Sequence, residues 1–153
     1  MKTTITYKSL KIILLAIPAG LFLFSFVTFF LVSNGMVEAS SSGDIGVFRN
    51  LVPIAIVLGV GGSYLLGNKL LKSAKTEKGL ANKLKAYQKM SIIKTALLEV
   101  PGLIAVVAAL LTGEIQFLFV AMAIVVVMVI GVPTKEKVME MLELSPSDRQ
   151  KFK

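Results

Sequence analysis

The sequence contains no cysteine and no histidine. Without them the chain cannot form disulfides, use a thiolate nucleophile or build a Cys/His zinc site. Haem held by histidine or cysteine, a common use of four-helix membrane bundles, is excluded for the same reason. We therefore expect no cofactor, no metal site and no catalytic residue, and the sequence shows no pairing of a nucleophile with a base.

Acidic residues are also scarce, since 9 Asp and Glu face 17 Lys and Arg, for a net charge of +8. The basic residues are unevenly distributed along the chain. In a membrane protein such basicity sets the orientation in the bilayer and does not indicate binding to nucleic acid. We expect no nucleic-acid partner.

Apolar residues are abundant, at 55% of the chain with a mean hydropathy of +0.79. They lie in four runs, over residues 12–32, 51–67, 92–113 and 115–133. The first run would form a helix about 31 Å long, which matches a hydrocarbon core of about 30 Å. It is longer than a usual signal-peptide core, so we expect it to be retained as a span. The predicted fold is all-α, a four-transmembrane-helix bundle forming one membrane domain over residues 1–153.

Lysine and arginine predict the orientation. Of the 17 basic residues, 16 lie before the first run, between the second and third runs, or after the fourth. Lys94, near the start of the third run, is counted with the second group, and Arg49 is the exception. The positive-inside rule then places both termini and the loop 68–91 in the cytoplasm. The predicted location is the inner (plasma) membrane, crossed several times. On the other side lie residues 33–50, predicted as a loop, and the turn at 112–114.

The two halves of the chain resemble each other as two similar hairpins. Residues 16–21 in the first run parallel residues 99–103 in the third when one gap is allowed. The match aligns Pro18 with Pro101 and Gly20 with Gly102. Both prolines are predicted helix kinks, because proline removes a helical hydrogen bond. The similarity fits either a duplication or the small set of residues that membrane helices use.

Small residues recur every four positions in two of the runs, which predicts a helix-packing face. The second run carries Ala55, Gly59, Ser63 and Gly67, and the third carries Ala105, Ala109 and Gly113. Small residues at this spacing let two helix backbones approach closely. Simple helix packing is the first interpretation, and a substrate groove or a self-association face is the alternative.

The two predicted cytoplasmic segments read as short amphipathic helices. Residues 68–94 form a hairpin interrupted near Gly79, with a lysine-rich surface over 69–94 that would meet anionic headgroups or, alternatively, an acidic partner. In the tail, residues 134–153, Thr134 is a predicted N-cap. The sequence Ser145-Pro146-Ser147-Asp148 then starts a second helix, and the tail is expected to fold beneath the bundle.

Glu99 is the only acidic residue inside an apolar run. A carboxylate at the centre of a membrane helix costs about 3 kcal/mol, so such residues are usually functional. By depth, Tyr64 and Ser63 are its predicted partners, which makes the three an ion- or proton-site candidate. The alternative is a structural carboxylate that ties the third run to its neighbours.

Two functions follow from these features. The first is a non-enzymatic accessory or structural subunit of a membrane complex, forming a homo- or hetero-oligomer in the lipid bilayer. The second is a small proton- or cation-coupled transporter that uses Glu99. The sequence does not name a substrate, a partner or a stoichiometry.

Overall fold

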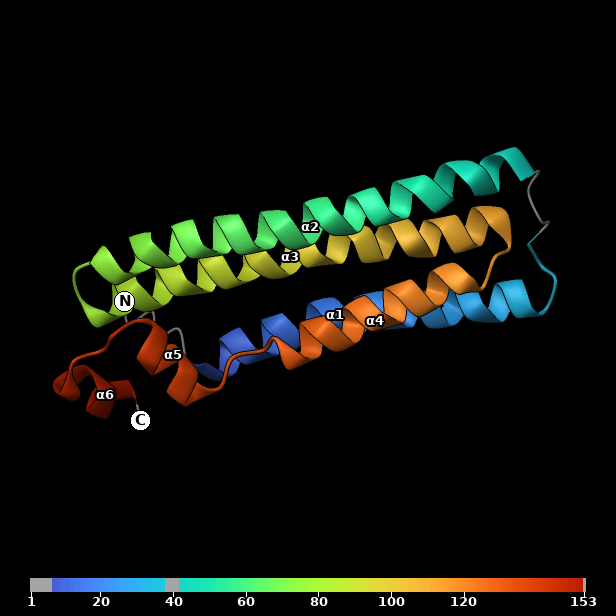
Figure 1. Ribbon diagram of the computed structural model, residues 1–153. Coiled ribbons are helices and arrows are strands. Elements are labelled where there is room, and N and C mark those ends of the chain that lie inside the picture. The colour runs from blue at the N-terminus through green and yellow to red at the C-terminus, as the bar shows by residue number, and fades with distance from the viewer. Residues whose placement is uncertain (1–6, 38–41, 153) are drawn as a thin grey trace.

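The computed structural model describes residues 7–37 and 42–152, and all regular secondary structure in these residues is helical. Four long helices lie side by side in an elongated bundle, and two short helices gather at one end of it (Figure 1). We call this end, where the α2–α3 loop also lies, the tail end. In chain order the helices are α1 (Tyr7–Ser33), α2 (Ser42–Thr76), α3 (Leu80–Thr112), α4 (Gln116–Ile130), α5 (Lys135–Met141) and α6 (Pro146–Phe152).

Three of these helices, α1, α2 and α3, are each long and apolar enough to cross a membrane. With 15 residues, α4 is too short alone, and it qualifies only together with α5, across a bend of 75°. The helix ends at Ile130, three residues before the end of the predicted fourth run, 115–133. Gly131 closes the helix, and the ring of Pro133 disfavours a helical conformation at the residue before it. The all-helical prediction is confirmed, with three to four candidate spans.

The long helices extend beyond the predicted runs. Residues 42–50, predicted as part of a loop, form the first turns of α2, so the prediction is wrong there. The reason is visible at Phe48, which packs half-buried against the bundle core and extends the apolar face of the helix. At the other end α2 and α3 continue as the predicted hairpin, and Gly79 separates them with a φ of 86°.

The central helix of the bundle is α3. It packs against α1, α2 and α4, whereas α2 makes extensive contact with α3 alone. The main helix pair therefore joins the second and third runs, across the boundary between the two hairpins that the sequence suggested. The small residues of α2 explain this pairing, because they let its backbone approach α3 more closely than larger side chains would.

The apolar residues form two clusters at different heights. The bundle core contains Leu21 of α1, Ala105 and Ala109 of α3, and Ala121 of α4 among its buried members. The second cluster lies at the tail end and joins α1, α2 and α3 to the C-terminal segment; its buried members are Leu10, Leu14, Ala74, Tyr87, Met90, Val138, Leu142 and Leu144. The tail is therefore packed beneath the bundle, as predicted.

Both predicted helix starts in the tail are present. The Thr134 hydroxyl accepts a hydrogen bond from the Lys137 backbone N–H at 3.3 Å, which caps α5. The Ser145 hydroxyl likewise accepts from the Asp148 N–H at 3.3 Å, and Pro146 is the first residue of α6. These caps satisfy N–H groups that the first turn of a helix leaves without partners.

One ion pair joins the tail to α2, with Lys75 Nζ 2.6 Å from Glu143 Oε1. The hydrogen bond from Lys75 and its positive charge lower the pKa of the Glu143 carboxyl. Glu143 is fully open to water, and exposed pairs of this kind contribute little to stability. The apolar contacts of α5, and not this pair, hold the tail in place.

Candidate functional site

A partly open cavity of about 150 Å³ lies at the tail end, between the α2–α3 pair and the segment that leads from α4 into α5. This is enough space for several water molecules or a small polar group. All of the long helices and α5 contribute to its wall, so it exists only in the folded chain. The lining residues are Leu14, Ser63, Tyr64, Gly67, Asn68, Leu71, Tyr87, Met90, Ser91, Lys94, Thr95, Met128, Gly131, Val132, Pro133, Lys137 and Met141.

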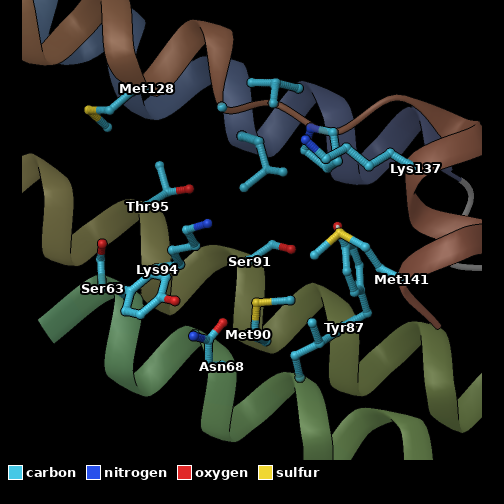
Figure 2. A pocket seen from close by; sticks show the side chains of 17 residues that line it. Ser63, Asn68, Tyr87, Met90, Ser91, Lys94, Thr95, Met128, Lys137 and Met141 are labelled. Atoms are coloured by element: carbon cyan, nitrogen blue, oxygen red, sulfur yellow. The ribbon is translucent and has the colours of Figure 1, made fainter. Parts of the chain in front are cut away.

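The charge in this cavity is entirely positive. Lys94 of α3 and Lys137 of α5 reach into it from different sides (Figure 2), and no described aspartate or glutamate lines it. The stem of Lys94 passes 3.4 Å from the Cβ that Gly67 would carry, so the small residue on α2 leaves room for it. Long lysine stems commonly lie along apolar surface in this way. The cavity therefore suits a negatively charged group.

Two buried hydroxyl groups belong to the same wall. Tyr87 is 2% exposed and Ser91 is 6% exposed, and both lie on α3. The Tyr87 hydroxyl donates to Met141 Sδ at 3.7 Å, with the Ser91 hydroxyl as a further polar neighbour. Because a thioether is a weak acceptor, this phenol remains able to serve a stronger one.

The proposed partners of Glu99 also line the cavity, but Glu99 does not. Ser63 is 4% exposed and donates its hydroxyl hydrogen to the Val60 carbonyl at 3.0 Å. Tyr64 is 66% exposed. Within the described residues, neither side chain is hydrogen-bonded to Glu99. The structure thus places Ser63 and Tyr64 together and leaves the acid outside their site.

Glu99 lies half-buried on α3, one turn deeper into the bundle than the cavity. It follows Thr95, a lining residue, by four positions, so the two share a helix face about 6 Å apart along the axis. Among the described residues no hydrogen bond or ion pair reaches its carboxylate. The acid is therefore close to the cavity without being part of its wall.

The predicted packing face of α2 lies against α3. Ala55, Gly59, Ser63 and Gly67 are all buried. A Cβ built on Gly59 would lie 2.8 Å from the Leu97 carbonyl oxygen and 2.9 Å from the ring of Pro101. This contact requires glycine, because neither the carbonyl nor the ring can move aside cheaply.

The remaining predicted residues divide between packing and helix ends. Ala105 and Ala109 are fully buried in the bundle core, and the buried rings of Pro18 and Pro101 lie within α1 and α3, which continue through them. Gly113 is different from the other small residues. It follows the last turn of α3 with a φ of 72° and donates its N–H to the Ala109 carbonyl, so it ends the helix.

Sequence reasoning missed Lys137 and Thr95 as members of a site. Tyr87 and Ser91 carried a signal, because they share one face of the helix expected before Lys94 with Leu80 and Leu84. Hydroxyl groups buried on such an apolar face need polar partners. No signal marked Lys137, because its position depends on how the tail folds back. In the part of the chain that the structure describes, no three acidic or metal-binding side chains gather into a possible metal site.

Comparison with protein-family models, with curated proteins and with solved structures finds no match to this chain. Its function is therefore argued from its own residues and geometry.

Proposed function

We propose that the chain is a non-enzymatic accessory or structural subunit of a membrane complex, with its tail end in the cytoplasm of the inner (plasma) membrane. The orientation is supported by the described basic residues, because Lys8, Lys11, the lysines of the α2–α3 hairpin, Lys135 and Lys137 all belong to the tail end. Cytoplasmic segments of membrane proteins carry this excess of lysine.

The observation that carries the proposal is the surface formed at the tail end by the α2–α3 hairpin and the tail packed against it, which we call the platform. There α2 and α3 continue as a paired hairpin beyond the apolar runs. The tail packs beneath it through Val138 of α5 and through Leu142, the residue that follows α5. A hairpin braced in this way presents a fixed surface rather than a mobile loop. Fixed surfaces lose less conformational entropy on binding, which favours a docking role.

The platform offers lysines to an acidic partner protein. Lys72, Lys78, Lys85 and Lys89 are exposed on the hairpin, and none of them is paired with a described carboxylate. Complementary charge speeds association and selects between partners. The partner we propose is therefore a protein with an acidic cytoplasmic face.

Neutralising part of the platform tests this role. The Lys85→Gln/Lys89→Gln variant should recover about tenfold less partner in mild detergent than the unaltered chain, because it loses two of the contacts that attract an acidic face. Native mass spectrometry of the purified complex measures the recovered partner. The matched control, Lys8→Gln/Lys11→Gln, removes the same charge from exposed positions on α1 and should keep the partner. Recovery of the unaltered chain without any partner would contradict the proposal.

One observation favours the second function, a proton- or cation-coupled transporter. Glu99 lies one turn beyond Thr95, close to a partly open cavity but outside its wall, and its carboxylate has no partner among the described residues. An ionisable group inside a membrane span, reached from a polar cavity, is the arrangement that carriers use to exchange protons.

Glu99→Gln separates a carrier from a structural subunit. In liposomes containing a pH-sensitive dye, a carrier built on Glu99 should lose its proton flux in this variant, because the amide cannot take up or release a proton. Assembly of the variant should be unchanged, as gel filtration in detergent would show. Glu114→Gln, at the opposite end of the bundle, is the control. Full flux in the Glu99→Gln variant would show that Glu99 does not exchange ions.

A further inference from the structure

The cavity at the tail end holds two positive charges without a balancing negative one. Neither Lys94 nor Lys137 forms an ion pair with a described carboxylate, although Lys75 nearby does so with Glu143. Both lysines are exposed, so water screens the repulsion between their ammonium groups without removing it. An anion between them would remove this cost and gain two charge-assisted hydrogen bonds.

The donors around this space match the oxygen atoms of a phosphate group. Besides the two lysines, the wall presents the hydroxyls of Tyr87 and Ser91, which are buried and come from the same helix. Tyr87 donates at present to a sulfur atom 3.7 Å away. A phosphate oxygen is a far stronger acceptor than a thioether sulfur, so the phenol would form a stronger hydrogen bond with the phosphate.

The wall also has an apolar part, which adjoins the surface that lipid would cover. Leu14 and Met128 line the cavity from the bundle side, where α1 and α4 have their apolar surfaces. The lysines lie where the apolar runs end, at Lys94 on α3 and just after Pro133. This is the height of lipid headgroups in a membrane, and basic pockets between helices at this height bind them.

We propose that the cavity binds a phosphate group through Lys94, Lys137, Tyr87 and Ser91, and that an anionic phospholipid at the cytoplasmic surface supplies it. The bound headgroup joins α3 to α5, so it also fastens the tail to the bundle. A free phosphate or a small phosphorylated molecule has the same chemistry and is distinguished by experiment. The site does not depend on the partner protein proposed above.

The experiment compares three probes on the full chain, purified in detergent and stripped of lipid. The probes are phosphatidylglycerol, phosphatidylcholine and inorganic phosphate, and native mass spectrometry measures how much of each is retained. Phosphatidylglycerol should bind with one preferred site and at least about tenfold more tightly than phosphatidylcholine, because only the former carries a net negative charge.

Variants then assign the site. Lys94→Gln/Lys137→Gln should weaken phosphatidylglycerol binding by about tenfold or more, since it removes both charge-assisted contacts. Lys8→Gln/Lys11→Gln, which removes the same charge outside the cavity, should bind as the unaltered chain does. Tyr87→Phe keeps the packing and removes the phenol, and should weaken binding to a smaller degree.

The other outcomes are equally decisive. Inorganic phosphate bound as tightly as phosphatidylglycerol, and lost in the Lys94/Lys137 variant, would support the site and assign it to a free phosphate. Equal losses in both lysine pairs would show attraction by overall charge and overturn the site. Equal retention of the two lipids by the unaltered chain would overturn it as well.

Discussion

Replacing Gly59 with alanine is expected to destabilise the bundle by about 1–3 kcal/mol, the usual cost of forcing an extra carbon into a packed interface. The added Cβ would lie 2.8 Å from the Leu97 carbonyl oxygen and 2.9 Å from the Pro101 ring. Both obstacles are rigid, so α2 must move away from α3, the only helix with which it makes extensive contact. Thermal unfolding in detergent, followed by circular dichroism, measures the loss. Gly59→Leu should abolish the α2–α3 pairing altogether.

Gly61 provides the matched control on the same helix. A Cβ at this position meets no atom within 4 Å. Because alanine is the better helix former, Gly61→Ala should stabilise the protein by about 0.5–1 kcal/mol. Similar melting temperatures for the two alanine variants would contradict the close α2–α3 packing described above.

The second large effect is expected at Leu142, in the apolar cluster of the tail end. Its side chain is 0% exposed, and Leu142→Ala should weaken docking of the tail by about 2–5 kcal/mol. The exposed Lys75–Glu143 pair contributes little to stability, so Glu143→Gln should leave the tail docked. The tail of the Leu142→Ala variant should be cleaved faster by added protease.

The absence of cysteine gives a direct measure of this docking. A single cysteine introduced at Met141, which lines the cavity, should react slowly with a thiol reagent in the otherwise unaltered chain. The same cysteine should react much faster when Leu142 is replaced by alanine. Glu140→Ala, an exposed change on the same helix, should not alter the rate. An unchanged rate in the Leu142→Ala variant would show that α5 is held by other contacts.

Features with a local cause were predictable from the sequence. Thr134 and Ser145 cap helices because a hydroxyl at that position accepts from an N–H three residues later, and both bonds are present. The small residues of α2 indicated a face on which another helix packs closely. The pattern does not identify that helix, because the glycine at position 59 indicates only that some other segment packs closely there.

The candidate site was less predictable from the sequence. Two residues at the same depth along the bundle need not have side chains that are neighbours. Equal depth along the helix axes predicts Ser63 and Tyr64 as partners of Glu99. The rotation of α2 and α3 about those axes points the two α2 residues into the cavity and Glu99 to the turn beyond it. The place of Lys137 was harder still to predict, because it depends on the bend of 75° between α4 and α5, which brings this residue back under the bundle. Neither the rotation nor the bend follows from hydropathy.

The pairing of the helices sets an order for biogenesis. Because α1 packs on α3 and α4, and α2 on α3, the first two helices are synthesised before the main partner of either. The bond from the Tyr7 hydroxyl to the Pro133 carbonyl, 2.9 Å long, joins positions 126 residues apart. A nascent chain therefore reaches this arrangement only after Pro133 has been synthesised. A product terminated before this position would lack both the bond and the docked tail, which would leave the tail end of the bundle open to a protease.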